Sequence, residues 1–236
     1  MKTIGLIGGM SWESTAVYYR RINEEVRRLR GGLHSAEIAM RSLDFTRVVA
    51  LQQAGRWDEA GALLGEAGAG LARSGAGCVL ICTNTMHLVA EPVAAMAGVP
   101  LIDIIAETAR ALHADRRRKP LLLATRYTME HGFYTSRMQQ LGLDVVTPAP
   151  EDRQAVHDVI FNELCQGQVR DASRARYLDI IARARAEGVD SVILGCTEIS
   201  LLVDPDNLPL PGYDSTTIHA DAAVRFALAD NLERAA

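Results

Sequence analysis

The sequence has few of the residues on which several common kinds of protein depend. Its 236 residues include four cysteines, Cys78, Cys82, Cys165 and Cys196. So few cysteines in a chain of this length argue against a disulfide scaffold. Their spacing and that of the six histidines match no zinc-ligand pattern, since Cys78 and Cys82 have no matching pair downstream. We therefore predict reduced thiols and no metal ligands.

Lysine and long apolar runs are also scarce. The only lysines are Lys2, at the terminus, and Lys119, in the basic run 116–119. Neither is well placed for the Schiff base of a pyridoxal phosphate enzyme. No apolar stretch approaches the ~18 residues that span a bilayer, and the N-terminal apolar run is too short for a signal peptide. We expect a cytoplasmic protein that uses no pyridoxal phosphate and has no membrane contact.

The charge and glycine patterns exclude two further classes of protein. The formal net charge is -4, so no general basic excess would attract nucleic acid, and the basic run 116–119 fits the end of a solvated helix. The N-terminal glycines are Gly5, Gly8 and Gly9. This spacing fails the dinucleotide fingerprint, which argues against a nicotinamide or flavin enzyme. We predict no cofactor and no nucleic-acid partner.

Short apolar segments alternate with longer amphipathic ones along the chain. Predicted strands are Thr3–Ile7, Ala36–Leu43, Cys78–Ile81, Leu121–Ala124, Asp144–Val146 and Ser191–Leu194, with shorter ones at Pro100–Ile102 and Leu208–Leu210. Predicted helices are Ser14–Leu29, Asp58–Ser74, Met129–Leu141, Arg153–Cys165, Ser173–Glu187 and Thr216–Ala229. Strands that alternate with helices predict an α/β fold with mostly parallel sheets.

The segments that follow the predicted strands are rich in small and hydroxyl side chains. They are Gly8–Ser11, Cys82–His87, Thr125–Thr128 and Gly195–Glu198. Open parallel sheets bind their ligands outside the carboxyl ends of the strands. Hydroxyls and free backbone N–H groups at helix starts bind anions such as carboxylates. These four segments are therefore the predicted site.

Three landmarks repeat at a nearly constant separation of about 114 residues. Cys82-Thr83 recurs as Cys196-Thr197, Leu6 to Gly9 resembles Leu122 to Thr125, and Asp103 matches Asp214. We infer two copies of one α/β unit: two pseudo-symmetric three-layer αβα domains, residues 1–102 and 103–210. Copies related by a two-fold axis would face each other at their carboxyl edges. The active site is then expected in the cleft between them.

Two cysteines occupy the same place in this repeat. Cys82 and Cys196 each end an apolar strand and meet a threonine at a helix start, which favours a lowered thiol pKa. An isolated free cysteine is most often a small buried hydrophobe, as we expect for Cys78, whereas Cys165 fits either packing or the rim of the site. Two opposed thiols suit one reaction well. One thiolate removes the α-proton of an amino acid, and the other thiol returns a proton to the opposite face.

Other polar groups would stabilise the charge that develops on the substrate carboxylate. The candidates are Ser11, Asn84, Thr85, Thr125, Thr128 and Thr197. Glu198 adjoins Cys196 and would take or orient its proton, or it is simply a glutamate that suits the first turn of a helix. His87 would help to position the Cys82 thiol, or it is a hydrogen-bonded helix histidine.

The same segments resemble a known family. The matching pieces are Ile4–Thr15, Cys82–His87, Thr125–Met129 and Leu194–Ile199. Together they are similar to the aspartate/glutamate racemase superfamily, and most of all to its aspartate racemase and broad-specificity amino-acid racemase branch. The resemblance implies a pyridoxal-independent isomerase with two pseudo-symmetric α/β domains, a two-thiol mechanism and a homodimer. It also implies that a C-terminal helix, in about 211–236, packs back on the first domain.

The resemblance also implies roles for individual residues. Cys82 and Cys196 match the catalytic cysteines. The expected substrate-binding set is Met10, Ser11, Thr83, Asn84, Thr85, Thr125, Tyr127, Thr128, Thr197 and Glu198. Within it, Asn84, Thr85 and Thr197 match residues that hold the substrate's carboxylate and amino group. Met10, Ser11, Thr125 and Thr128 match the walls of that pocket.

Two departures from the family pattern bear on the substrate. Glutamate racemases carry a histidine where this chain has Glu198, and aspartate-selective relatives tend to carry a basic residue in the stretch that matches Leu164–Gly167. We therefore expect either broad specificity or recognition of a side-chain carboxylate by Arg47 or Arg126. The predicted function is racemisation of aspartate, glutamate or a wider set of amino acids. The alternatives are maleate isomerisation, hydantoin racemisation, a ligand sensor and a thiol switch.

Overall fold

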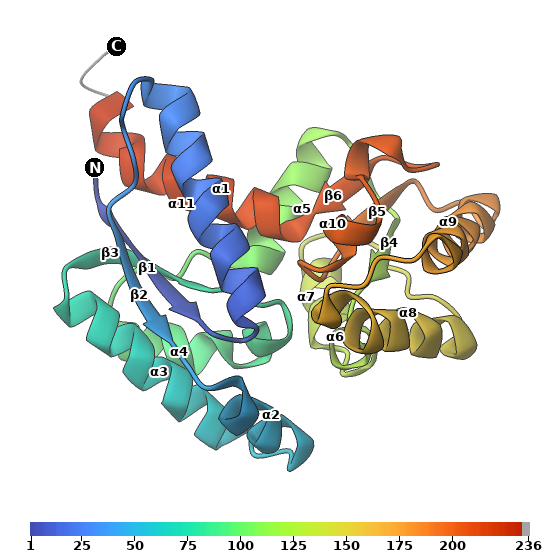
Figure 1. Ribbon diagram of the computed structural model, residues 1–236, viewed down its shortest axis with the longest axis horizontal. Coiled ribbons are helices and arrows are strands. Elements are labelled where there is room, and N and C mark those ends of the chain that lie inside the picture. The colour runs from blue at the N-terminus through green and yellow to red at the C-terminus, as the bar shows by residue number, and fades with distance from the viewer. Residues whose placement is uncertain (233–236) are drawn as a thin grey trace. The chain divides into compact units, whose positions relative to one another are not determined.

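The protein, described by a computed structural model over residues 1–232, has an α/β fold in two compact units. The first unit contains Met1–Asp103 and the chain from His219 on, and the second is Ile104–Ile218 (Figure 1). The predicted α/β class with parallel sheets is confirmed. The chain returns to the first unit at His219, after a strand of the second sheet, Gly212–Asp214, and the first residues of the last helix. Residues 233–236 of the predicted C-terminal segment lie outside the described residues.

The first unit is built on a three-stranded parallel sheet of order β2-β1-β3. Its elements are β1 (Thr3–Gly8), α1 (Trp12–Arg30), β2 (Ile38–Ser42), α2 (Phe45–Gln53), α3 (Trp57–Arg73), β3 (Ala76–Ile81), the 3-10 helix η1 (Thr85–Val89) and α4 (Ala90–Ala97). The long helix α11 (Ser215–Leu232) begins in the second unit and continues in the first.

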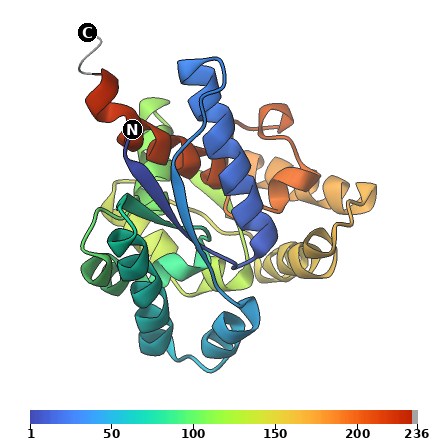
Figure 2. The ribbon, with the colours of Figure 1, turned by 60° about the vertical axis from the view of Figure 1, so that its left-hand side comes forward.

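Helices cover both faces of the first sheet because its strands β1 and β3 are apolar on both sides. Ile7, Val79 and Ile81 pack with α3 and α4 in one buried cluster. Their neighbours Leu6 and Leu80 point the opposite way and pack with α1 and α11 in another. Successive side chains of a strand alternate between its faces, so strands buried on both faces read as continuous apolar runs. The result is the three-layer arrangement visible in Figure 2.

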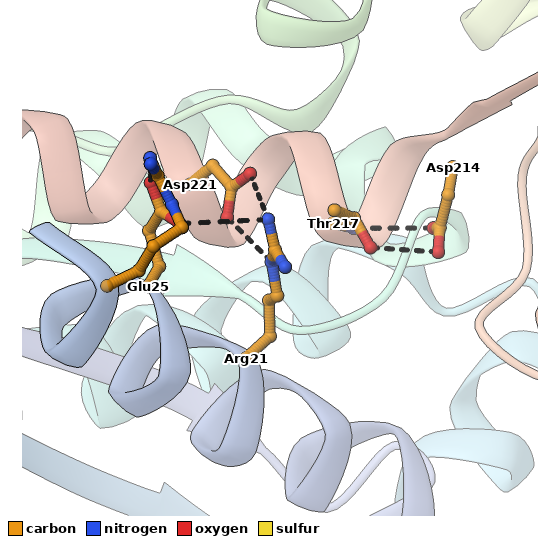
Figure 3. Close-up of polar contacts among 6 residues, drawn as sticks. Arg21, Glu25, Asp214, Thr217 and Asp221 are labelled. Carbon is orange, nitrogen blue, oxygen red and sulfur yellow. Dashed lines mark hydrogen bonds and ion pairs between the residues drawn. The ribbon is translucent and has the colours of Figure 1, made fainter.

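An ion pair joins α1 to α11 within the first unit. The Arg21 guanidinium donates two hydrogen bonds to Asp221, from Nε to Oδ1 at 2.8 Å and from Nη2 to Oδ2 at 2.7 Å (Figure 3). Glu25, one turn further along α1, also lies 3.9 Å from the Arg21 Nη2. Paired N–H donors facing both oxygens of one carboxylate are geometrically specific. The pair therefore fixes the register of α11 on α1.

The second unit is built on a parallel sheet of order β4-β5-β6. Its elements are α5 (Ile104–Ala114), β4 (Pro120–Leu123), α6 (Arg126–Glu130), α7 (Phe133–Gln140), α8 (Pro150–Asn162), η2 (Leu164–Gln166), α9 (Asp171–Ala186), β5 (Ser191–Leu194), α10 (Ile199–Leu202), η3 (Pro205–Asn207) and β6 (Gly212–Asp214). One continuous buried core joins the sheet to its helices.

The two sheets have the same strand order once single-residue bridges are included. Leu101 pairs in parallel beside β3, and Val146 pairs in parallel beside β4. The orders are then β2-β1-β3-Leu101 and Val146-β4-β5-β6, so β1 matches β4 and β3 matches β5. A backbone bond continues each of these central pairs beyond the strands, from Cys82 N–H to Ile7 and from Gly195 N–H to Leu123. The repeated unit inferred from the spacing is therefore present in the fold.

Several predicted elements differ from the structure. The predicted strand Leu208–Leu210 is wrong, because Pro209 and Pro211 lack the N–H that a sheet requires, and the strand begins at Gly212. The predicted strands Pro100–Ile102 and Asp144–Val146 reduce to single bridges.

The predicted helix Met129–Leu141 is two helices, α6 and α7, divided at Gly132, whose φ is +76°. Helices α2, α4, α5 and α10 are absent from the predicted set. In the described part of the chain, no helix is both long enough and apolar enough to cross a membrane.

Candidate active site

Half of the predicted site residues gather at the carboxyl edge of the first sheet. The ends of β1 and β3 are neighbours, with Ile7 paired to Ile81. The loops that follow them carry Met10 and Ser11 from β1, and Cys82, Thr83, Asn84 and Thr85 from β3. Ser11 caps α1, because its Oγ accepts a hydrogen bond from the Ser14 N–H at 3.2 Å. A polar cap thus forms one side of this half-site.

Cys82 is fully buried where β3 ends. Its N–H donates to the Ile7 carbonyl at 3.0 Å, and its own carbonyl accepts from the Ser14 hydroxyl at 3.2 Å. Burial raises the pKa of the Cys82 thiol well above its ordinary value, because a thiolate loses its hydration there. The lowered thiol pKa expected from the sequence is therefore wrong for the free protein, in which burial outweighs the helix start and Cys82 is a neutral thiol that can donate a proton.

The remaining residues of this half-site differ in exposure. Asn84 and Thr85, which open η1, are almost wholly buried, whereas Thr83 is half-buried. Met10 is buried in the core cluster that packs α3 and α4 on the sheet. Of the two predicted pocket walls in this unit, Ser11 is thus the more accessible to solvent.

The other half of the predicted residues gathers at the carboxyl edge of the second sheet. Leu123 at the end of β4 pairs with Leu194 at the end of β5. Thr125, Tyr127 and Thr128 follow β4, whereas Cys196, Thr197 and Glu198 follow β5. The loops are tied locally by hydroxyl contacts, Thr125 to Thr128 at 3.2 Å and Thr197 to Thr216 at 3.4 Å. The Tyr127 ring stacks on His131 at 5.4 Å between centroids.

Cys196 differs from Cys82 in having a carboxylate partner. Its Sγ donates to Glu198 Oε2 at 2.9 Å. Its pKa is raised well above the ordinary value, first by burial, then by the charge and hydrogen bond of Glu198, and further by Cys165. These causes favour the protonated thiol and outweigh a backbone hydrogen bond of Glu198 that lowers the pKa. Cys196 is therefore a thiol whose proton already points at a group able to accept it.

Three residues that support these loops were absent from the predicted set. The hydroxyl of Ser14 holds the Cys82 carbonyl, and Thr216 contacts Thr197. Asp214 caps α11, because its Oδ1 accepts from the Thr216 N–H at 2.9 Å. Its Oδ2 also accepts from the Thr217 hydroxyl at 3.0 Å (Figure 3). The Asp-Ser-Thr-Thr run at 214–217 is a capping signal that identifies this position in the sequence.

The remaining thiols and candidate arginines lie in ordinary surroundings. Cys78 is buried in the core, and burial raises its pKa to about 11, whereas Cys165 is exposed. Arg47 lines a groove of about 900 Å³ on the first unit. Arg126 lines a hollow of about 160 Å³ beside Tyr127. Within residues 1–232, no three His, Cys, Asp or Glu side chains are grouped to hold a metal ion.

The family follows from a match over most of the chain. Residues 7–223 match the Asp/Glu/Hydantoin racemase family. This chain belongs to that family. It is accordingly an isomerase of the racemase type, as the sequence segments around the two thiols predicted.

Solved structures agree with this assignment. A protein of Yersinia pestis, provisionally described as an Asp/Glu racemase, is 47% identical over 97% of this chain and 100% of its own, with a TM-score of 0.92. An aspartate racemase homologue of Pyrococcus horikoshii is 32% identical over 96% and 99% of the two chains, with a TM-score of 0.85. The aspartate racemase of Picrophilus torridus, 19% identical over 96% and 94%, shares the fold with a TM-score of 0.76.

Proposed function

We propose that this protein racemises an amino acid, aspartate, glutamate or a wider set, without pyridoxal phosphate and with Cys82 and Cys196 as its two acid–base groups. One observation carries the proposal. The two thiols follow corresponding strands, β3 and β5, of two sheets with the same strand order. A repeated unit that offers one thiol at each copy's carboxyl edge suits a reaction that needs one acid–base group on each face of a carbon.

The different surroundings of the thiols suggest their starting roles. The Cys196 proton passes to Glu198, to which it already donates at 2.9 Å. The resulting thiolate takes the α-proton from one face of the substrate, and the neutral Cys82 thiol gives its proton to the opposite face. Cys82 then ends as the thiolate and Cys196 as the thiol. Glu198 is left with the proton it took, and return of that proton to Cys82 through solvent restores the starting state. Substrate of the other handedness runs the same steps in reverse, beginning from the form with the Cys82 thiolate and the protonated Glu198.

The intermediate of this reaction carries its negative charge largely on the substrate carboxylate. Hydroxyl and amide donors fixed before the reaction stabilise such charge most effectively. Asn84 and Thr85 in the first unit, and Thr125, Thr128 and Thr197 in the second, are the proposed donors. Ser11, Thr83 and Tyr127 complete the proposed lining, and the buried Met10 supports it from the core.

The family name and the relatives' descriptions favour an acidic side chain on the substrate. A side-chain carboxylate requires a strong donor, and Arg supplies the best match in geometry. Arg47 and Arg126 are the proposed candidates. Gln166, in the stretch where aspartate-selective relatives tend to be basic, is a weaker donor. The expected homodimer and cytoplasmic location stay predictions.

Proton NMR in deuterated buffer tests the proposal most simply. The protein, with no added cofactor, is supplied separately with single enantiomers of aspartate, glutamate, homoserine and alanine, and with a hydantoin and maleate. Loss of the α-proton signal together with appearance of the opposite enantiomer on a chiral column is the expected result for at least one amino acid. Turnover of only the hydantoin or maleate would overturn it.

A further inference from the structure

A buried cluster of rings lies behind the Cys82 loop in the first unit. His87, on η1, is 2% exposed, and Tyr18 and His219 are fully buried. The His87 ring meets the His219 ring edge-on, with 5.6 Å between centroids, and the Tyr18 ring meets His219 edge-on at 5.5 Å. Burying a polar ring destabilises the fold unless its polar atoms are hydrogen-bonded. The hydrogen-bond partners of these rings therefore indicate which part of the structure the cluster supports.

The hydrogen bonds show which ring nitrogen carries a hydrogen in each histidine. His219 Nε2 lies 2.7 Å from the Ile102 carbonyl, which can only accept, so Nε2 carries the hydrogen. In the neutral ring Nδ1 is then an acceptor, and the Tyr18 hydroxyl donates to it at 2.7 Å. His87 Nδ1 lies 2.8 Å from the Thr83 carbonyl, so that nitrogen is the donor in His87.

The His87 bond reaches the residue next to the thiol. Side chains thereby bind two successive carbonyls: Ser14 holds that of Cys82 and His87 holds that of Thr83. The Cys82 N–H bond to Ile7 and the Ser14 bond hold the two peptide planes that flank the Cys82 Cα, and the His87 bond holds the next plane along the chain. Because peptide units are planar, fixing the next plane limits how far the turn that carries the Cys82 Cα–Cβ bond can rotate. A catalytic group misplaced by about 1 Å can cost roughly 100-fold in rate.

The position that matches His87 in the second unit carries no ring. Five residues after Cys196 lies Leu201, at the position that matches His87, and its side chain is 53% exposed. Cys196 instead has the Glu198 carboxylate within hydrogen-bond distance. Any effect of the ring cluster should therefore fall on Cys82 alone.

We propose that His87 is a positioning residue for the Cys82 thiol, and that His219 and Tyr18 hold its ring in place. A role of His87 in catalysis rests on the proposed function, in which Cys82 is one of the two acid–base groups. The structural part, that His87 controls the geometry of Cys82, can be tested whether or not the protein is a racemase.

Two variants of His87 separate its donor from its bulk. In His87→Asn the side-chain amide N–H can take the place of the Nδ1 donor, whereas His87→Ala removes the donor. His113→Ala is the matched control, since it deletes a ring-to-carbonyl hydrogen bond of 2.7 Å in the second unit. Thermal unfolding of each variant confirms that it is folded.

The first readout is the rate at which iodoacetamide alkylates each cysteine, followed by peptide mass spectrometry across pH. We expect His87→Ala to change the Cys82 rate at least 10-fold relative to Cys196, and His87→Asn to restore it to within about threefold. Tyr18→Phe should change the rate in the same direction by less. A Cys82-to-Cys196 ratio in His87→Ala within twofold of the unmodified protein would overturn the proposal.

The second readout uses the substrate identified by NMR. With Cys82 misplaced, Cys196 still removes and returns the α-proton of one enantiomer, so exchange without inversion should rise for that enantiomer only. An unchanged ratio of α-proton exchange to inversion for both enantiomers in His87→Ala would mean a merely structural role and overturn the proposal, whereas His87→Asn should bring a raised ratio back toward that of the unmodified protein. If the unmodified protein inverts no amino acid, the proposed function fails, and the alkylation ratio still decides the role of His87.

Discussion

The two thiols are protonated for different physical reasons. Burial alone raises the pKa of Cys82, whereas the Glu198 carboxylate adds to burial at Cys196. Only Cys196 therefore has a nearby group that can accept its proton. Replacing Glu198 should therefore make the Cys196 thiol more acidic and at the same time slow racemisation.

Glu198→Gln should lower the pKa of the Cys196 thiol while slowing racemisation. The amide has no charge to raise that pKa, but it cannot accept the proton, and losing a general base costs about 100- to 10,000-fold. The kcat/KM must fall equally for both enantiomers, since their equilibrium constant is one. Thiol reactivity against pH and chiral chromatography measure the two effects.

Glu107→Gln is the matched control for this experiment. Glu107 is 9% exposed, against 8% for Glu198, and it pairs with Arg110 on α5. The control should retain full turnover. Unchanged turnover in Glu198→Gln itself would remove Glu198 from the proposed mechanism.

His219 should make stability depend on pH. Its pKa is lowered from 6.5 to about 3, first by burial and then by His87. Below pH 6.5 the unfolded chain therefore binds a proton that the folded chain does not. The free energy of unfolding should then fall by up to about 1.4 kcal/mol per pH unit as the pH drops from 6.5 toward 3.

The comparison variant for this prediction is His219→Gln. It lacks the titrating group, so the difference between the two stability curves isolates His219 from the carboxylates. Urea unfolding at pH 7 and pH 5 is the measurement. A difference between the curves that does not change with pH would contradict the lowered pKa.

At the residue scale, the sequence predicts contacts made within a loop better than contacts made across the fold. The positions of Cys82, Cys196 and Glu198 just after strands were predictable because strand ends and helix starts are local patterns. The Tyr18–His219 bond joins residues 201 positions apart, and no local pattern contains it. The His87 bond to Thr83 is local, yet the sequence left two roles open because it does not show the rings behind His87.

At the element scale, the loop after β1 requires glycine at one position. Gly9 has a φ of +86°, and a Cβ there would overlap the backbone of Leu43 after β2. Gly75 has a similar φ of +90° before β3, but a Cβ there would meet nothing within 4 Å. The two glycines therefore share a backbone conformation and differ in the space around them.

Gly9→Ala should destabilise the fold much more than Gly75→Ala. A positive φ alone costs roughly 1–2 kcal/mol in a residue other than glycine. The clash with Leu43 should take Gly9→Ala beyond about 3 kcal/mol, the range of strained or overpacked sites. Urea unfolding of both variants is the measurement, and equal destabilisation would mean that the approach of β2 to this loop is unimportant.

Strands that are buried on both faces could be predicted from their continuous apolar runs. Helices and bridges whose limits depend on local backbone conformation could not. Strand Ser191–Leu194 was predicted with its exact ends because it is apolar on both faces. Helix α4 follows the 3-10 helix η1 directly, so it offers no loop to mark its start. The bridges at Leu101 and Val146 are too short to give a period-two pattern.

At the scale of the whole molecule, the repeat is the feature that links fold to function. Both sheets have the same order, and Asp103 and Asp214 each directly precede a helix, α5 and α11. The nearly constant spacing of three sequence landmarks predicted this repeat. How the two units meet lies beyond any such pattern, so the central claim requires a functional test of both thiols together.

Cysteine-to-serine variants give the most direct test. Cys82→Ser, Cys196→Ser and the control Cys78→Ala, at a thiol of the core, are compared by circular dichroism and by chiral chromatography on the substrate identified by NMR. We predict that all three fold, that the first two lose racemisation, and that Cys78→Ala retains it. Near-normal racemisation by either Cys82→Ser or Cys196→Ser would contradict the two-thiol account.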